Sequence, residues 1–281
     1  MSHSTRFDIT LGVHSDPSQC LLMLQVLEEG LRLLVVDQEK HPLLYRLIQF
    51  DRSAVELDSA LVDWLRENHQ WLQSWSEIVV VHQGIQSAVI PAAVFHEESS
   101  KELLDLQYGD LFRGTTLTDL VAGREDYVIY RVPTSWYHAL SDANYKVRHR
   151  HFFSLWIKWL DGLPKDPAIG QAYLMFETNR VAMAIRRDEW LLLQQYEYHV
   201  PEDISYFLLS ALEQFNMSPE TVHVTLDGWI DVQSALYLEL FKYIRNLYTV
   251  KLPDSVQLDK ALFQEQPEHY FTPLIQMATC V

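Results

Sequence analysis

The chain has 281 residues, of which 48% are hydrophobic and 21% charged, and its formal net charge is −16. This length predicts one large or two medium-sized domains, and the composition is that of a soluble globular protein. No apolar run approaches the roughly 18 to 20 residues that a membrane span needs. The negative charge disfavours nucleic acids and acidic membrane surfaces as partners, and it favours either basic proteins or simply a solvated acidic surface.

The sequence also indicates a compartment. Its N-terminus, Met1 to Arg6, lacks the apolar core of a signal peptide. Two cysteines, Cys20 and Cys280, do not form a disulfide framework. We therefore expect a cytoplasmic protein with reduced thiols.

After an expected edge strand at Arg6–Val13, a first repeat runs from Cys20 to Gly84 in the order strand, strand, strand, helix, strand. Ser53 and Glu56 form a candidate capping box for the helix, which we expect to end near Trp75. Short polar turns between the first three strands indicate an antiparallel meander. The predicted strands are Cys20–Leu27, Leu31–Val36, Leu43–Phe50 and Glu77–His82.

The segment between the repeats is less regular. Its expected elements are a strand from Ser87, a helix over Glu97–Leu106, a polar loop or hairpin at Tyr108–Gly123, a strand at Tyr127–Val132, and helices at Thr134–Leu140 and His151–Leu160. Asp161–Pro167 then contains a glycine and two prolines and is the best candidate for a linker. We therefore expect two domains, residues 1–162 and 163–281.

The second repeat, Gln171 to Asp231, has the same predicted order as the first. Pro201 and two acidic residues open its helix, as the helix dipole favours. The predicted strands are Gln171–Glu177, Val181–Arg186, Trp190–Tyr198 and Thr221–Leu226. Further helices are expected at Val232–Tyr243, Leu258–Phe263 and Phe271–Met277, with a strand at Leu247–Leu252.

A three-strand meander followed by a helix and a strand is the core of a ribonuclease H-like unit. Two such units make an α/β protein with the actin-like ATPase arrangement, in which a nucleotide lies between them. Topology of this kind predicts a fold and leaves the function open.

The positions that hold nucleotide in active proteins of this fold look eroded here. A phosphate-binding hairpin needs Asp, Gly and small hydroxyl residues, so that backbone N–H groups meet the anion and the carboxylate holds magnesium. The first hairpin instead has Glu28-Glu29-Gly30-Leu31, the second has Thr178-Asn179-Arg180 without glycine, and no Gly-Gly pair occurs in the chain. Ordinary hairpin turns explain both segments better than ATP hydrolysis does.

Two other groups of residues could carry chemistry. Glu177, Glu213 and Asp227, with Asp231 nearby, match loosely the carboxylates of two-metal phosphodiester chemistry, although surface acids explain them better. A basic cluster, which could bind a phosphate or an acidic partner, is formed by His138, Lys146, Arg148, His149, Arg150 and His151. A solvated basic loop is the favoured interpretation of this segment. In a strand, its His149 and His151 would share one face and lack an evident third metal ligand.

Tryptophans are frequent. Trp64, Trp71 and Trp75 recur at helical spacing, which favours packing between helix and sheet over a protein-binding surface.

The chain resembles an uncharacterised bacterial family of unknown function, typical of Bacteroidetes, whose members have an actin-like ATPase fold. The resemblance rests on the order of elements together with Val89-Ile90-Pro91, the turn Leu226–Ile230 and His269-Tyr270-Phe271. It implies the fold and no established activity. More distantly, the plan is similar to actin-like assembly scaffolds of pilus and secretion machines.

We therefore predict a cytoplasmic protein that is not an enzyme, needs no cofactor and acts through a protein partner. The alternative is a divergent nucleotide-binding enzyme that takes ATP and magnesium between the two units. In that case Glu28, Gly30, Asn179, Asp227 and Gly228 would line the site, because their turns follow strand ends.

Overall fold

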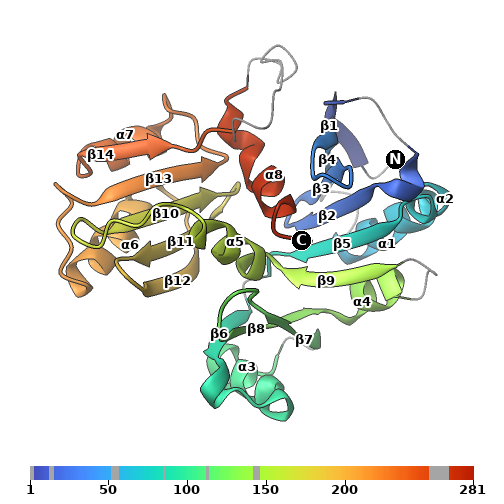
Figure 1. Ribbon diagram of the computed structural model, residues 1–281, viewed down its shortest axis with the longest axis horizontal. Coiled ribbons are helices and arrows are strands. Elements are labelled where there is room, and N and C mark those ends of the chain that lie inside the picture. Colours follow the sequence, from blue (N-terminus) through green and yellow to red (C-terminus); the bar gives the residue numbers. More distant parts are fainter. Residues whose placement is uncertain are drawn as a thin grey trace. The chain divides into compact units, whose positions relative to one another are not determined.

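The computed structural model describes residues 3–12, 16–51, 57–84, 86–111, 114–141, 146–252 and 266–281. The chain forms two compact units (Figure 1). The first unit consists of Met1–Asp161 together with Leu274–Val281, and the second of Gly162–Pro273. The predicted capping box at Ser53 and Glu56, and the helix predicted at Leu258–Phe263, lie outside the described residues.

The first unit is built on a six-stranded sheet in the order β1-β4-β3-β2-β5-β9. The strands β2, β3 and β4 form the predicted antiparallel meander, and β5 and β9 continue the sheet parallel to β2. The strand bounds are β1 His3–Thr10, β2 Leu21–Leu27, β3 Gly30–Val36, β4 Pro42–Phe50, β5 Glu77–His82 and β9 Val147–His151.

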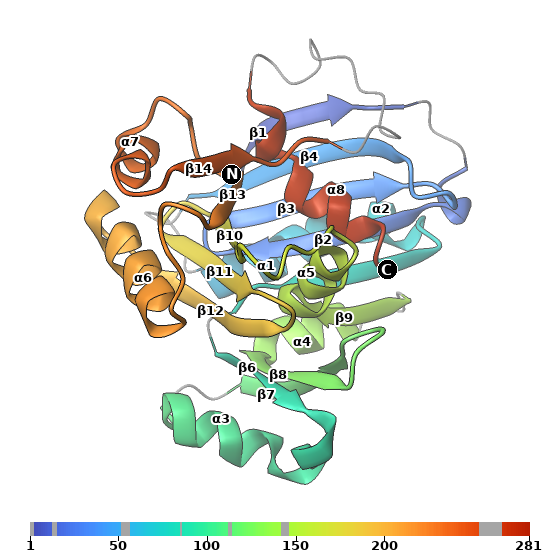
Figure 2. The same ribbon diagram turned by 60° about the vertical axis from the view of Figure 1, so that its left-hand side comes forward.

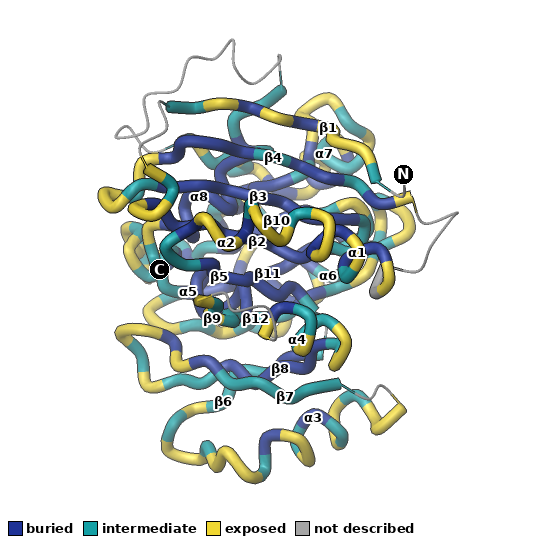
Figure 3. Tube along the Cα trace, turned by 90° about the vertical axis from the view of Figure 1, so that its right-hand side faces the viewer, coloured by how far each residue is buried: buried dark blue, intermediate teal, exposed yellow. Residues whose placement is uncertain are grey.

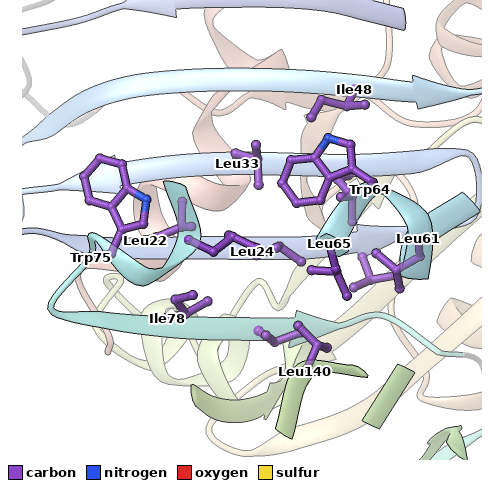
Figure 4. Close-up of a cluster of buried hydrophobic side chains, with 14 of the residues drawn as sticks. Leu22, Leu24, Leu33, Ile48, Leu61, Trp64, Leu65, Trp75, Ile78 and Leu140 are labelled. Atoms are coloured by element: carbon purple, nitrogen blue, oxygen red, sulfur yellow. The ribbon is translucent and has the colours of Figure 1, made fainter. Parts of the chain in front are cut away.

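One face of this sheet packs against helices that follow the meander. The predicted single helix is divided at Asn68 into α1 (Leu57–Glu67) and α2 (His69–Gln73). Trp64 and Trp75 are buried there against leucines of β2 and β3, as Figure 4 shows. These two tryptophans therefore belong to the core, and Trp71 packs half-buried against it.

Between β5 and β9 the chain forms an insert with a sheet of its own. The insert consists of β6 (Ser87–Pro91), two short 3-10 turns, α3 (Ser100–Tyr108), β7 (Gly114–Leu120) and β8 (Asp126–Pro133). Both β6 and β7 pair antiparallel with β8. The segment expected to be a loop or hairpin thus contains a regular strand, β7. The helix α4 (Thr134–Ser141) then leads to β9, and α5 (Phe152–Asp161) follows.

The second unit repeats the strand order of the first. Its sheet is ordered β12-β11-β10-β13-β14, which corresponds to β4-β3-β2-β5-β9. Helix α6 covers one face with Ile204, Leu208 and Leu212 (Figure 2). The bounds are β10 Gln171–Phe176, β11 Arg180–Arg186, β12 Trp190–Glu197, α6 Pro201–Gln214, β13 His223–Gly228, α7 Ala235–Phe241 and β14 Asn246–Thr249. A 3-10 turn at Glu268–Tyr270 precedes α8 (Thr272–Ala278), and the residues of α8 from Leu274 on belong to the first unit.

The start of the second unit is held by a buried arginine. The guanidinium of Arg186 donates hydrogen bonds to the carbonyls of Leu163 and Pro164 and to the hydroxyl of Tyr173. The rings of Tyr173 and Trp190 lie within cation–π distance of it, at 5.3 and 5.2 Å. These contacts fix the residues that precede β10.

Candidate functional site

In sheets of this topology, the turns at the carboxyl ends of the parallel strands are where ligands bind. In the first unit these ends carry Glu28 and His82, and in the second they carry Glu177 and Asp227.

The structure of the turn between β2 and β3 shows why Gly30 is a glycine. Leu27 pairs with Gly30, so Glu28 and Glu29 form a two-residue turn, and the N–H of Phe50 donates to the carbonyl of Glu29 at 2.9 Å. A Cβ atom on Gly30 would lie 1.9 Å from the carbonyl oxygen of Ile48. The glycine is therefore required by the close approach of β4, and no bound phosphate is needed to account for it.

The turn between β10 and β11, which contains Asn179, is held from the side by Tyr198. The N–H of Tyr198 donates to the carbonyl of Asn179 at 3.0 Å. The Tyr198 hydroxyl lies 3.1 and 3.2 Å from the carbonyls of Glu177 and Thr178. Arg180 pairs with Glu197 across the hairpin. The carbonyl groups of Glu177, Thr178 and Asn179 therefore all accept hydrogen bonds from Tyr198.

Asp227 is buried at the end of β13. Its Oδ1 accepts the N–H of Gly228 at 2.9 Å and a short hydrogen bond from the hydroxyl of Thr272, the first residue of α8. Close by, the ring of His269 contacts the carbonyl of Ile230 at 2.6 Å. The carboxylate therefore fastens the C-terminal segment of the second unit, a role that the sequence did not indicate.

Gly228 is also explained by packing. Its φ is 75°, and a Cβ atom would lie 2.3 Å from the carbonyl oxygen of Phe176 in β10. Phe176 pairs with Gly228, and Trp229 donates its N–H to the same carbonyl. This pairing places Gly228 and Asp227 at the same sheet edge as the turn that contains Asn179. That these residues line one ligand site together with Glu28 and Gly30 stays a prediction.

The carboxylates predicted as a possible two-metal site do not assemble around Asp227. Glu213 is exposed on α6, and Asp231 is exposed beyond the strand end. Within the described ranges, no group of three or more His, Cys, Asp or Glu side chains is arranged to hold a metal ion.

The basic segment expected to be a solvated loop is instead β9, and its cations are paired. Arg148 forms a salt bridge with Glu77 of the neighbouring strand β5. Arg150 lies 3.5 Å from the buried carboxylate of Asp119 in β7. The loop prediction was wrong because it judged local charge alone, whereas these charges are neutralised by strands distant in the sequence.

Strand β9 brings three histidines to one face of the first sheet. His82 pairs with His151 and Val80 with His149, so His82, His149 and His151 share a face. The imidazoles of His82 and His149 are joined by a hydrogen bond of 2.9 Å between Nε2 and Nδ1. Within the described ranges, the outer nitrogens of this pair, Nδ1 of His82 and Nε2 of His149, have no hydrogen-bond partner.

Burial keeps these histidines neutral. Loss of hydration lowers the pKa of His82 well below its ordinary value, and the neighbouring His149 and His151 lower it further. Burial also lowers the pKa of His149 and takes that of His151 to about 3. The alternation of His149 and His151 was visible in the sequence, but His82 joins them only through the parallel pairing of β5 and β9.

Asp119 connects the insert to this region. Its Oδ2 accepts the hydroxyl of Ser154 at 2.9 Å and the N–H of His151, and burial raises its pKa. The ring of Tyr130 in β8 lies 5.0 Å from that of His151 and 5.9 Å from that of His82. These contacts join the insert sheet to the carboxyl ends of β5 and β9.

Comparisons with known proteins place this geometry in a family and a fold. A family model described as "Protein of unknown function (DUF3822)" matches residues 13–247. No curated protein matches the sequence significantly. None of the helices in the described part of the chain is long and apolar enough to cross a membrane.

Solved structures show the same fold at low sequence identity. A Bacteroides thetaiotaomicron protein of unknown function with an actin-like ATPase fold is 16% identical, with a TM-score of 0.75 over 91% of this chain and 100% of that one. A chain of a PilM-PilN type IV pilus biogenesis complex is 15% identical, with a TM-score of 0.61 over 92% and 96%. The ethanolamine utilization protein EutJ of Carboxydothermus hydrogenoformans is 7% identical, with a TM-score of 0.53 over 97% and 93%. The predicted fold, with two ribonuclease H-like units, and the predicted resemblance are confirmed.

Proposed function

The chain belongs to the DUF3822 family of proteins of unknown function, and from this premise we propose that it is a non-catalytic cytoplasmic protein that acts by binding other proteins. The observation that carries the proposal is that the strand-end groups are engaged by the chain itself. Asp227 holds Thr272 and the N–H of Gly228, and Gly30 is required by the backbone of β4.

Binding of magnesium or phosphate at these strand ends would need groups other than those found there. Magnesium takes carboxylate oxygens that can exchange with water, and a phosphate takes converging N–H groups. The second hairpin directs three carbonyls toward Tyr198, and the first presents Glu28 and Glu29. Like charges repel an anion unless a metal intervenes. These features favour a role without nucleotide.

A role in protein contacts is supported by exposed apolar side chains and by one structural neighbour. Val94, Leu106 and Leu111 of the insert are largely exposed. Such side chains, where they gather, mark interfaces. The PilM-PilN neighbour has been solved as a protein complex, which supports this fold as a platform for binding proteins.

The test is a thermal melt with and without ATP or ADP and magnesium. A ligand at about 100 times its dissociation constant adds about 2.7 kcal/mol to stability, which is easily seen. We expect no shift. An upward shift that Asn179→Ala or Glu28→Ala reduces would overturn the proposal in favour of the nucleotide-binding enzyme.

A further inference from the structure

The outer side of the insert carries the two most exposed large apolar side chains within the described ranges. Leu111 is 96% exposed and Leu106 is 86% exposed, and Val94, which precedes the same helix, is 61% exposed. We call the region formed by Val94, the exposed residues of α3 and the three residues that follow it, Gly109 to Leu111, the α3 surface. In Figure 3 this part of the insert is largely exposed, in contrast to the buried strands of the main sheet.

Leu106 is exposed although its helix is firmly attached. Leu104 and Ser100 are buried beneath α3, and Leu106 lies about 200° around the helix from Leu104. The carboxylate of Asp105 binds the buried guanidinium of Arg131 at 2.6 Å. The hydroxyl of Tyr108 donates to the carbonyl of Ser87 at 2.7 Å. Leu106 therefore faces outward on a fixed helix.

Acidic side chains border these apolar groups. Glu102 precedes Leu106 by one helical turn on α3, and Asp110 lies just beyond the end of the helix at Gly109. The nearby cation Lys101 is paired with Asp105 in a salt bridge. The exposed carboxylates that lie on or beside α3 are Glu97, Glu98, Glu102 and Asp110.

From this combination we propose that the α3 surface binds a basic amphipathic helix of a partner protein. The proposal rests on the proposed function and names the surface and the partner's chemistry. A helix with leucine-like residues on one face covers exposed leucines, and lysines or arginines beside that face meet the acidic border. Charge complementarity selects this occupant, because a second copy of a chain with a net charge of −16 and an anionic lipid surface would both be repelled.

The probe is a short synthetic peptide helix of leucine and lysine, compared with a peptide of the same pattern in which glutamate replaces lysine. Binding to the full chain is measured by fluorescence anisotropy at low and high salt. The test variant is Leu106→Ser with Leu111→Ser. The matched control is Leu238→Ser with Phe241→Ser on α7, where the side chains are 53% and 61% exposed. All four positions are at the surface, so folding is preserved in both variants.

We expect the basic peptide to bind the control as it binds the wild type, and the α3 variant about tenfold or more weakly. The acidic peptide should not bind, and salt should weaken the basic one. Equal affinity for the two variants would overturn the proposed surface. If the basic peptide fails to bind and ATP gives no thermal shift, the surface is wrong and the protein-binding function stands. A thermal shift with ATP that Asn179→Ala or Glu28→Ala reduces overturns that function independently.

Discussion

His82 and His149 form a hydrogen bond between Nε2 and Nδ1 that leaves the outer nitrogen of each ring without a partner among the described residues. If either ring donates to the other, one outer nitrogen is an unpaired N–H and the other an unpaired acceptor. Protonation makes both outer nitrogens unpaired donors in a buried place, which explains physically why the pair resists a proton.

The first prediction is that acid weakens the protein through this pair. Burial lowers the pKa of both histidines from the ordinary value of 6.5. Below that pH the unfolded chain therefore binds more protons at these two side chains than the folded protein does. Stability is therefore complete above about pH 6.5 and is lost as the pH falls below it. While the buried His82 ring stays neutral, each pH unit below that value lowers the free energy of unfolding by about 1.4 kcal/mol.

Urea unfolding at several pH values below 6.5 measures this loss. The groups near the pair are His151, Tyr130 and Tyr137, with Asp119 and Arg150 beyond them. We expect His82→Gln to have a shallower pH dependence than wild type, whatever its stability at neutral pH. The exposed His96→Gln is the control and should keep the wild-type slope. Identical slopes for His82→Gln and wild type would contradict the prediction.

The second prediction concerns Gly30. Because a Cβ atom there would lie 1.9 Å from the carbonyl oxygen of Ile48, Gly30→Ala must displace β4 or the turn. We expect a loss of about 3 kcal/mol in the free energy of unfolding. Gly109→Ala is the control, since Gly109 has φ 78° and open space around its Cβ position, so only backbone strain of about 1 kcal/mol applies. A loss no greater than that of the control would show that the turn can adjust.

Gly30 and His82 differ in what the sequence alone could predict about them. The meander, the helix and the following strand were predicted in both units because each is local in the sequence and has its own periodicity. The glycine at the first hairpin, Gly30, was also noted in the sequence. The reason a glycine is needed there is the close approach of β4, which the local sequence of the hairpin does not show. The sequence did not indicate that His82 lies beside His149 and His151, or that β7 pairs with β8. Pairing between strands that are distant in the sequence, such as β5 and β9, leaves no local pattern.

The third prediction tests whether Asp227 fastens the C-terminal segment. Thr272→Val keeps the shape of the buried side chain and removes the hydroxyl that donates to Asp227. The buried carboxylate then loses one donor, which costs about 1 to 3 kcal/mol. Chemical unfolding measures the loss, and the exposed Thr178→Val is the control, expected within about 0.5 kcal/mol of wild type. If Asp227→Asn and Thr272→Val give strictly additive losses, the two side chains are not coupled and the assignment fails.

The fourth prediction separates two cations that meet the same carboxylate. Arg131 binds Asp105 from beneath α3 and is buried, whereas Lys101 binds it from the solvent side. Arg131→Met removes the buried partner, so we expect amide hydrogens of α3 to exchange about tenfold faster or more. Lys101→Met removes only an exposed ion pair, which contributes little, and exchange should stay near wild type. Equal exchange in the two variants would mean that α3 is held by Leu104 and Tyr108 alone. In that case the fixed outward position of Leu106 would owe nothing to the buried arginine.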